Sequence, residues 1–543
     1  MKHVIVILIA FGALALMAGC SSTAVKRDVV AVNHPEGKLQ TVVVDAPPER
    51  EQINPRAFNL FVNGTIFEEL NDLESAVQNY RNALQIHPTS YEIRYSLAHV
   101  LFRMEQFEDA LETLEYIKPL DVPALELRAS CYRYLGQEAN ARDTYFKVVE
   151  LDSLNTMAYS YLSSVYRRSG NIDSVIWSYE NLTRLRPANY RLWAELGKLY
   201  ADRREFSRAK RALHKSIDLV ADETNLMTFA RLGEIYEMTE APDSALAVYK
   251  EGLAVTPTDV LLNRMTANLY VSLDSIAQAI PHAAAVVEQT PMDKPAARRL
   301  GSIYFGADSL AQADSIFSTL VDMSDFHPVN YYYLGRIAVS QEDFERARDN
   351  FIRLTQVADT LVDSWLDLAF TYRRLNQTEN EITTYKTGLN HMRDEAGAIR
   401  LLFGLGATYE RTGRVEEAIE VFEELIAQVP DNAEALNFLG YMLADRGERL
   451  EYAKDLIERA LQTSPENAAF LDSYGWVAYR LGSFDEAVEY LNRAVALDND
   501  PVIFDHLGDA YRATGDMEQA QKWWRKALEM SPEDEKIKEK LGH

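Results

Sequence analysis

Small and apolar positions recur along this chain about every 34 residues between Ala57 and Pro532. The units begin at residues 57, 91, 122, 156, 190, 226, 260, 294, 328, 362, 399, 433, 468 and 501. Their twentieth position is Ala in nearly every unit, with Val175 and Glu381 as exceptions. Their eighth position is always Gly, Ala or Ser: Gly64, Ala98, Ala129, Ser163, Gly197, Gly233, Ala267, Gly301, Gly335, Ala369, Gly406, Gly440, Gly475 and Gly508. Such a recurrence indicates a repeat architecture.

Large residues and prolines recur in the same units. Position 11 is most often Tyr, position 24 is usually aromatic, and position 32 is Pro in several units, from Pro88 to Pro532. A small residue on each of two helices lets them cross closely, aromatic residues fill the wedge beside the contact, and Pro ends the second helix. Each unit is therefore predicted to be a helix, a turn and a second helix, stacked on copies of itself.

These columns resemble the tetratricopeptide repeat, whose pattern has Trp, Leu, Gly, Tyr, Ala, Phe, Ala and Pro near positions 4, 7, 8, 11, 20, 24, 27 and 32. The two fullest units contain Trp193, Leu196, Gly197, Tyr200 and Ala209, and Leu507, Gly508, Tyr511, Ala520, Ala527 and Pro532. The resemblance covers residues 57–532 and implies an all-α, right-handed superhelical solenoid of about fourteen helical hairpins. We expect residues 533–543 to form a capping helix, whose Ile537 and Leu541 cover the last unit.

The N-terminus has the features of a secretory signal peptide at residues 1–19. Lys2 and His3 precede an apolar run from Val4 to Met17, which is too short for a comfortable membrane span. The stretch from Met17 to Cys20 resembles a bacterial lipobox, with Met in place of Leu at its first position, and this implies lipidation of Cys20. The alternative is a plain signal peptide with a chance cysteine. Ser21 and Ser22 follow, without the Asp that retains lipoproteins in the inner membrane, so the resemblance points to the outer membrane, facing the periplasm.

Residues 20–56 are predicted to be a lipidated N-terminus and flexible tether, because they lack helical periodicity and are rich in Pro and Gly. Val42, Val43 and Val44 could instead add a short strand to a partner.

The composition argues against nucleic acid as a partner, because the formal net charge is −26. Residues 151–220 are nevertheless basic, which indicates either a solvated face with internal ion pairs or a patch for an acidic peptide. Apart from Cys20, the only cysteine is Cys131, which is expected to be a small core residue rather than a reactive thiol.

We find no catalytic, metal or cofactor motif in the sequence. The ten histidines are scattered, and HExxH, GxSxG, GxxxxGK[ST] and CxxC are absent. The protein is therefore not expected to be an enzyme, and no cofactor is predicted.

Partner-binding residues are predicted from the resemblance, which implies that positions 2, 5, 9 and 12 of each first helix line a concave groove. In the last three units these columns contain Asn437, Tyr441, Asp472, Trp476, Tyr479, Asp505, Asp509 and Arg512. Aromatic rings beside amide and carboxylate groups suit a peptide with basic side chains. Trp476 and Tyr479 could instead cover the seam between units, and the groove would then move to the stretch with Arg264, Arg298, Tyr332 and Arg336.

A narrower resemblance concerns residues 437–445, 471–476 and 506–511, which look like the C-terminal units of bacterial outer-membrane tetratricopeptide lipoproteins. One such lipoprotein activates a periplasmic carboxyl-terminal-processing protease and presents cell-wall hydrolases to it. The resemblance implies a non-catalytic adaptor, lipid-anchored in the bacterial cell envelope, that binds protein or peptide partners. The alternative is an assembly factor for outer-membrane or polymer-export machinery. The sequence leaves the oligomeric state open.

Overall fold

The computed structural model describes residues 29–33, 39–43 and 53–542 of the chain. The expected signal peptide, the lipobox and Cys20 lie outside these residues. The described part divides into two compact units, residues 1–269 and 270–543, with the boundary inside one helix. We call them unit 1 and unit 2 and describe each by itself.

A short β-hairpin precedes the helices. Strand β1 (Val29–Asn33) pairs antiparallel with β2 (Leu39–Val43), with Val29 opposite Val43. From the sequence we expected an extended linker here, with a short strand added to a partner as the alternative, and did not expect a hairpin within the chain. The valine-rich segments have high β propensity and pair with each other within the chain. The tether function of residues 20–56 stays a prediction.

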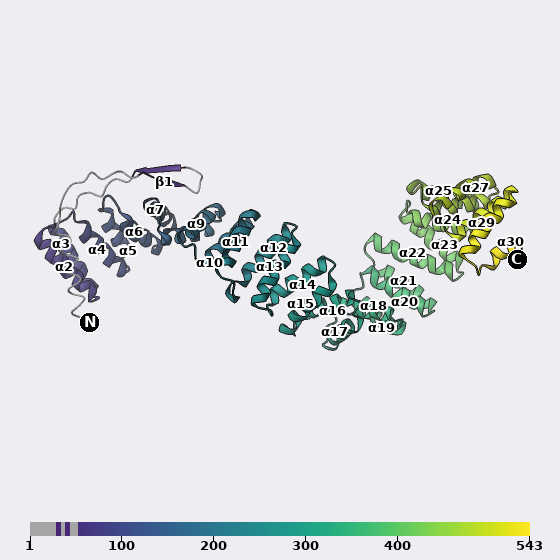
Figure 1. Ribbon diagram of the computed structural model, residues 1–543, viewed down its shortest axis with the longest axis horizontal. Coiled ribbons are helices and arrows are strands. Elements are labelled where there is room, and N and C mark those ends of the chain that lie inside the picture. The colour runs from purple at the N-terminus through teal and green to yellow at the C-terminus, as the bar shows by residue number, and fades with distance from the viewer. Residues whose placement is uncertain (1–28, 34–38, 44–52, 543) are drawn as a thin grey trace. The chain divides into compact units, whose positions relative to one another are not determined.

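In unit 1 the helices follow one another as antiparallel pairs (Figure 1). They are α2 (Pro55–Glu69), α3 (Leu73–Ile86), α4 (Tyr91–Arg103), α5 (Phe107–Glu115), α6 (Val122–Tyr134), α7 (Glu138–Leu151), α8 (Thr156–Arg168), α9 (Ile172–Leu185), α10 (Tyr190–Asp202), α11 (Phe206–Leu219), the short 3-10 helix η1 (Glu223–Asn225), α12 (Leu226–Met238), α13 (Pro242–Val255) and α14 (Val260–Ser272), which contains the boundary.

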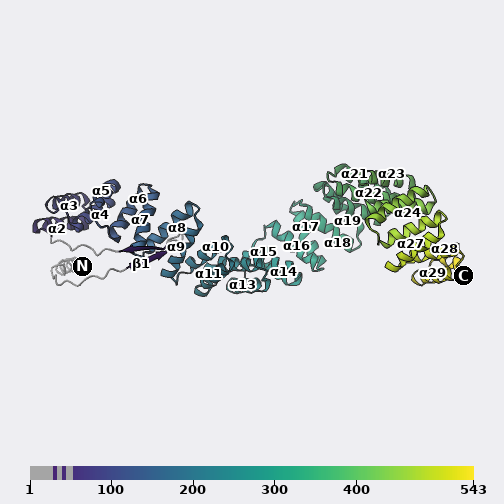
Figure 2. The ribbon, with the colours of Figure 1, turned by 90° about the horizontal axis from the view of Figure 1, so that it is seen from above.

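Unit 2 continues the same alternation (Figure 2). Its helices are α15 (Ile276–Gln289), α16 (Lys294–Gly306), α17 (Leu310–Asp322), α18 (Pro328–Ser340), α19 (Phe344–Val357), α20 (Val362–Arg374), α21 (Thr378–His391), α22 (Glu395–Arg411), α23 (Val415–Gln428), α24 (Ala433–Arg446), α25 (Leu450–Thr463), α26 (Ala468–Arg480), α27 (Phe484–Leu497), α28 (Pro501–Thr514), α29 (Met517–Met530) and α30 (Glu535–Leu541).

The helices from α2 to α29 alternate as fourteen first helices and fourteen second helices along the sequence, so the predicted all-α repeat architecture is confirmed. Twelve of the fourteen first helices begin at the predicted residue, and only α2 and α22 begin earlier, at Pro55 and Glu395. Among the described residues, no helix has the length and apolar character needed to cross a membrane.

Side-chain caps explain why many first helices begin where they do. Asn155 Oδ1 accepts a hydrogen bond from the backbone N–H of Ala158, and Asn432 Oδ1 accepts one from Ala435, both at 2.9 Å. These bonds satisfy N–H groups that have no partner within the helix.

The small residue at position 8 packs directly against the large residue at position 24 of the same unit. A Cβ on Gly406 would lie 2.7 Å from the ring of Phe422, and one on Gly508 would lie 2.5 Å from the ring of Trp524. Because a Cβ would not fit at these two glycines without a shift, the first helices of these hairpins need the smallest residue where the aromatic ring crosses them.

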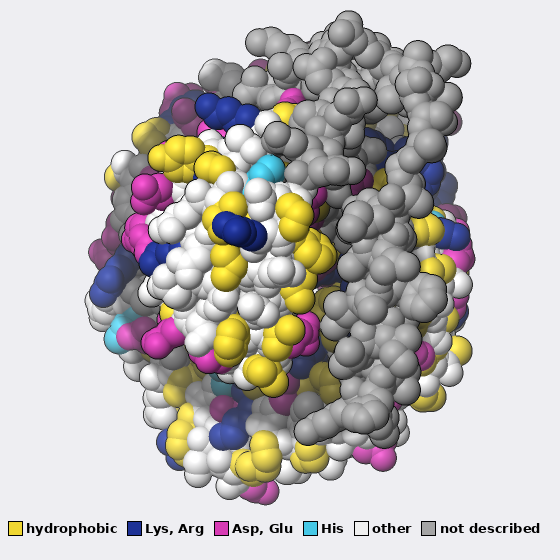
Figure 3. Space-filling model, turned by 90° about the vertical axis from the view of Figure 1, so that its left-hand side faces the viewer, with side chains coloured by type: hydrophobic (Ala, Val, Ile, Leu, Met, Phe, Trp, Pro, Cys, Tyr) yellow, Lys and Arg dark blue, Asp and Glu magenta, His cyan; other side chains and the backbone are white. Residues whose placement is uncertain are grey.

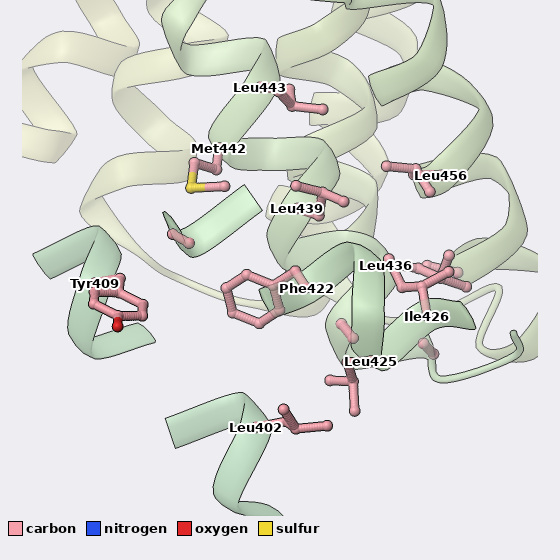
Figure 4. Packing of buried hydrophobic residues seen from close by; sticks show 14 of the residues in the cluster. Leu402, Tyr409, Phe422, Leu425, Ile426, Leu436, Leu439, Met442, Leu443 and Leu456 are labelled. Carbon is pink, nitrogen blue, oxygen red and sulfur yellow. The ribbon is translucent and has the colours of Figure 1, made fainter. Parts of the chain in front are cut away.

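Around Phe422 this packing becomes a continuous core. Side chains from α22, α23, α24 and α25 meet there, among them Leu402, Leu425, Leu439 and Leu456 (Figure 4). The hairpins are therefore joined by shared apolar contacts and not only by their turns.

Glu381 departs from the Ala column and is buried. Its side chain is 2% exposed, accepts a hydrogen bond from Thr408 Oγ1 at 2.9 Å and pairs with Arg411 Nη2 at 2.7 Å. The carboxylate of α21 thus makes a polar link to α22, where other units have a methyl group.

The last helix, α30, lies where the sequence predicts a capping helix. Ile537 is buried in one cluster with Trp523 and Trp524, and Leu541 packs at its edge. The described C-terminal end of the array therefore has its apolar face covered.

Candidate partner-binding groove

The eight residues predicted to bind a partner come from three first helices, α24, α26 and α28. Helix α26 contacts both α24 and α28. Residues one repeat apart therefore lie side by side, which is the arrangement that the column pattern predicts.

A buried ion pair lies at the centre of this surface. His506 Nδ1 is 2.9 Å from Asp472 Oδ1 and 3.1 Å from Oδ2, and both side chains are buried. The ring of Trp476 stacks on His506 with centroids 4.2 Å apart, and the ring of Tyr441 lies 6.2 Å from it. The ring of Tyr479 also stacks on the Trp476 indole, with centroids 5.0 Å apart.

The other two carboxylates are occupied by the chain's own lysine. Lys540 of α30 donates hydrogen bonds to Asp505 Oδ1 at 2.7 Å, Asp505 Oδ2 at 2.8 Å and Asp509 Oδ2 at 2.8 Å. Arg512 Nη2 also lies 3.5 Å from Asp509 Oδ1. A basic side chain of a partner would have to displace Lys540 to reach these groups.

Electrostatic interactions in this cluster favour the protonated, charged forms of His506 and Lys540. Burial opposes the charge on His506, but attraction and hydrogen bonding by Asp472, with help from Asp505 and Asp509, outweigh it and raise the pKa of the imidazole. Burial likewise opposes the charge on Lys540, and its hydrogen bonds to Asp505 and Asp509 raise its pKa overall. Burial is also the main reason why the pKa of Asp505 is raised, although Lys540 opposes the shift.

Tyr441 is held neutral in this environment. Burial, followed by the nearby carboxylates of Asp445, Asp472 and Glu410, raises the pKa of its phenol to about 12. Tyr441 therefore offers an apolar ring face and a hydroxyl group, but no charge, at neutral pH.

The structure brings seven of the eight predicted residues into two groups of contacts. Tyr441, Asp472, Trp476 and Tyr479 gather around His506, whereas Asp505 and Asp509 bind Lys540, with Arg512 beside Asp509. The eighth residue, Asn437, belongs to α24. Its Oδ1 atom is buried without a hydrogen-bond partner among the described residues, as is Nε1 of Trp476. Stacking on His506 and Tyr479, rather than a protein acceptor for its N–H, holds the Trp476 ring. The assignment of these residues to partner binding stays a prediction.

Sequence reasoning missed His506 and Lys540. His506 was counted among the scattered histidines, and Lys540 only as part of the cap. The signal that could have found them is their spacing, because Asp472, His506 and Lys540 follow one another at intervals of 34 residues. Residues about one repeat apart lie on neighbouring helices of the array, where His506 meets Asp472 and Lys540 meets Asp505 and Asp509.

The basic segment 151–220 contains ion pairs between neighbouring hairpins. Arg168 lies 2.6 Å from Glu138, and Arg203 lies 3.0 Å from Asp173. These pairs favour the interpretation as a solvated, internally paired face, although they join neighbouring hairpins rather than residues of one helix.

Cys131 is buried in the core of unit 1, and burial raises the pKa of its thiol to about 12. The thiolate is therefore scarce at neutral pH, as expected for a core residue. Among the described residues, no group of three or more His, Cys, Asp or Glu side chains could hold a metal ion.

Comparison with known proteins identifies the repeat. Residues 69–129, 399–442, 448–501 and 503–534 each match the tetratricopeptide repeat family. The chain therefore contains tetratricopeptide repeats, which form scaffolds for protein–protein interaction.

Individual relatives match only part of the chain, or match most of it at low sequence identity. The TPR repeat-containing protein PA4667 of Pseudomonas aeruginosa is 30% identical over 175 residues, which are 32% of this chain and 28% of that protein. The chain thus spans little more than a quarter of the length of that relative. A structure of Naa15/Naa10 bound to HypK-THB has a TM-score of 0.42 at 14% identity over 88% of this chain and 76% of that one. The Cut9-Hcn1 hetero-tetramer has a TM-score of 0.35 at 15% identity over 90% and 96% of the two chains.

Proposed function

We propose that this protein is a non-catalytic, lipid-anchored adaptor of the bacterial cell envelope, which binds protein partners through its tetratricopeptide array. The observation that carries the proposal is the stacked set of first helices α24, α26 and α28, whose partly exposed rings Tyr441, Trp476 and Tyr479 lie on one network. Aromatic side chains provide large contact areas at low cost in conformational entropy, as partner-binding surfaces require.

Anchoring rests on the sequence of the N-terminus. Cys20→Ser should abolish labelling by radioactive palmitate and release the protein into a soluble envelope fraction. An unlabelled wild-type protein would contradict the anchor and leave the array as a soluble scaffold.

The surface near Trp476 should contribute more to binding than to folding. We expect Trp476→Ala to weaken partner capture by about 2 kcal/mol. Trp193→Ala in α10 is a matched control, because it removes the same side chain from another hairpin and should leave capture unchanged. Loss of helicity without a separate binding defect would identify Trp476 as seam packing, which its stacking on His506 also allows.

The partner is best sought directly. Among adaptors, recruitment or activation of a periplasmic processing protease or a cell-wall hydrolase is the most specific form that the C-terminal resemblance supports. Affinity purification from cross-linked envelopes, followed by mass spectrometry, should recover such an enzyme with the wild-type chain and less of it with Trp476→Ala. Recovery of barrel-assembly or export components instead would favour the assembly factor.

A further inference from the structure

The acid pair Asp505 and Asp509 forms a small site at the C-terminal end of the groove. Both carboxylates belong to α28, at positions 5 and 9 of its unit, which are columns expected to face a partner. Lys540 of α30 fills the site, and its ammonium group donates hydrogen bonds of 2.7 to 2.8 Å to three of the four carboxylate oxygens. The chain's own C-terminal helix therefore shows that this site binds a cation.

The fourth oxygen of the site, Oδ1 of Asp509, is left without a donor by the described residues. Asp509 is 6% exposed, so water does not readily replace the missing donor. Arg512 Nη2 lies 3.5 Å from this oxygen, which is longer than a charge-assisted hydrogen bond. An ammonium group has three N–H donors, and Lys540 already makes three hydrogen bonds. The site can therefore accept one more hydrogen bond than a lysine can donate.

A guanidinium group matches this set of acceptors better than an ammonium group does. It presents five N–H donors in a planar fork and pairs with carboxylates through parallel hydrogen bonds. One arginine side chain can thus supply a donor to every oxygen of two neighbouring carboxylates. Leaving a buried acceptor unpaired is costly, so a ligand that pairs the last oxygen is favoured over lysine.

The contact made by Lys540 is open enough to exchange. The neighbouring pair, His506 and Asp472, has side chains that are 8% and 9% exposed. The side chains of Lys540 and Asp505 are 20% and 23% exposed, so water reaches this second pair. Helix α30 has seven residues, too few for a helix that is stable alone, and Ile537 is the residue that it buries. A partner can therefore reach the acid pair by displacing one lysine side chain near the end of the chain, where local opening costs least.

We propose that Asp505 and Asp509 bind an arginine side chain of a partner protein, and that Lys540 occupies this subsite until the partner displaces it. The inference rests on the proposed function, because it identifies the partner chemistry of the same groove. Lys540 lowers the apparent affinity for the partner by keeping part of the population closed. The Trp476 ring stacks on His506, the residue next to Asp505, so aromatic contact area adjoins the subsite.

Two variants of the full chain change the occupant of the subsite in opposite directions. The probe is the peptide Gly-Arg-Arg-Gly with fluorescein on its N-terminus, and its affinity is measured by fluorescence anisotropy. Lys540→Met removes the competitor, so the peptide should bind about tenfold more tightly than to wild type. Lys540→Arg supplies the missing donor from within the chain, so the peptide should bind about threefold more weakly. Lys540→Arg keeps the charge, so its result stands even if Lys540→Met loosens the end of the array.

A matched variant controls for net charge. Lys454→Met removes an ammonium group that pairs with Glu486 at 3.2 Å, between the second helices α25 and α27. It changes the net charge by the same amount as Lys540→Met, and it should change the affinity for the arginine peptide by less than about twofold.

A second peptide tests the chemistry of the ligand. Gly-Lys-Lys-Gly has the same charge but fewer donors, so it should bind Lys540→Met about fivefold more weakly than the arginine peptide does. Adding Asp505→Asn and Asp509→Asn to Lys540→Met should abolish the gain for both peptides. The arginine peptide should also restore hydrogen-exchange protection of α28 in Lys540→Met and leave α10 unchanged.

The proposal is overturned if the arginine peptide binds Lys540→Met no more tightly than Lys454→Met, if Lys540→Arg binds it as well as wild type does, or if arginine has no advantage over lysine. The adaptor function is judged separately, by the capture of partners from envelopes. If Trp476→Ala weakens capture while the Lys540 variants bind peptide alike, the adaptor stands and the arginine subsite is wrong. If the peptide affinities change as expected while no partner is captured, the subsite stands and the adaptor is wrong.

Discussion

Removing the ammonium group of Lys540 should destabilise the C-terminal end of the array. Lys540→Met keeps the length and apolar stem of the side chain but removes three hydrogen bonds of 2.7 to 2.8 Å from Asp505 and Asp509. Two largely buried carboxylates then remain side by side. Arg512 lies 3.5 Å from Asp509 Oδ1, but that oxygen accepts no hydrogen bond among the described residues.

The magnitude follows from the burial of the three groups. Breaking a fully buried pair costs about 3 to 5 kcal/mol. The side chains of Lys540 and Asp505 are 20% and 23% exposed, so water screens part of the loss. We therefore expect the free energy of local unfolding of α28 to α30 to fall by about 2 kcal/mol.

Local measurement is essential, because long repeat arrays do not unfold in two states. Amide hydrogen exchange in α28 and α29 reports the local unfolding free energy, and α10 and α11 are the internal reference. The triple variant Lys540→Met, Asp505→Asn, Asp509→Asn removes all three charges together. Protection should then return to within about 1 kcal/mol of wild type, because replacing every member of a buried pair is often nearly neutral.

Acid provides an independent check. Burial already raises the pKa of Asp505 above its ordinary value, and the loss of Lys540 can only raise it further. The defect of Lys540→Met should therefore be full at pH 7 and shrink on acidification, before wild-type carboxyl groups protonate. Unchanged protection of α28 at pH 7 would show that the ion pairs contribute nothing, and that apolar contacts of Ile537 alone hold α30.

Three further outcomes are expected elsewhere. Arg411→Ala should lower the unfolding free energy of α21 and α22, measured by hydrogen exchange, by about 3 kcal/mol, because it leaves the buried charge of Glu381 unpaired. Glu381→Ala leaves no buried charge and should cost under about 1 kcal/mol, so equal losses would refute this. Protonated His506 should stabilise α26 to α28 below about pH 6.5, with this contribution lost as pH rises through its raised folded-state pKa; His506→Gln should abolish that pH step in exchange rates, and a step that persists would assign it to another group. In a Cys20→Ser background, Cys131 should react with a thiol reagent at pH 8 only when unit 1 opens, and labelling as fast as in the unfolded chain would contradict its burial.

The repeat columns were sufficient for the fold, because each column corresponds to one steric requirement. Gly406 had to be small since Phe422 crosses it, and the same pair recurs in other units at the same spacing. Even the starts of the first helices followed from this register, except for α2, which begins at Pro55, and α22, which extends upstream from the predicted residue 399 to Glu395, with Asp394 as its cap. The size required at a repeat position does not depend on which hydrogen-bond or ion-pair partner a side chain has. It can therefore be recognised in a single sequence.

The charged contacts of the groove were not visible in this way. In the predicted register Asp472 and Asp505 are equivalent positions, but His506, one residue further along α28, is the side chain that pairs with Asp472. A shift of one residue turns a side chain by about 100° around a helix and changes which acid meets which base. The sequence therefore predicted the surface on which Asp472, Asp505 and Asp509 lie, but not that two cations of the same chain already occupy it.

The two ends of the array differ in how their apolar faces are covered. A stack of hairpins must leave one apolar face open at each end, and capping elements normally cover these faces. At the C-terminal end α30 inserts Ile537 and ties itself down through Lys540. At the other end the described residues leave apolar side chains of α2 exposed, among them Phe58, Val62 and Ile66. Figure 3 views unit 1 from this end and shows hydrophobic side chains open on it. Exposed apolar side chains grouped on one helix face are typical of a contact surface, so among the described residues α2 differs from the closed C-terminal end in keeping apolar surface for a further contact.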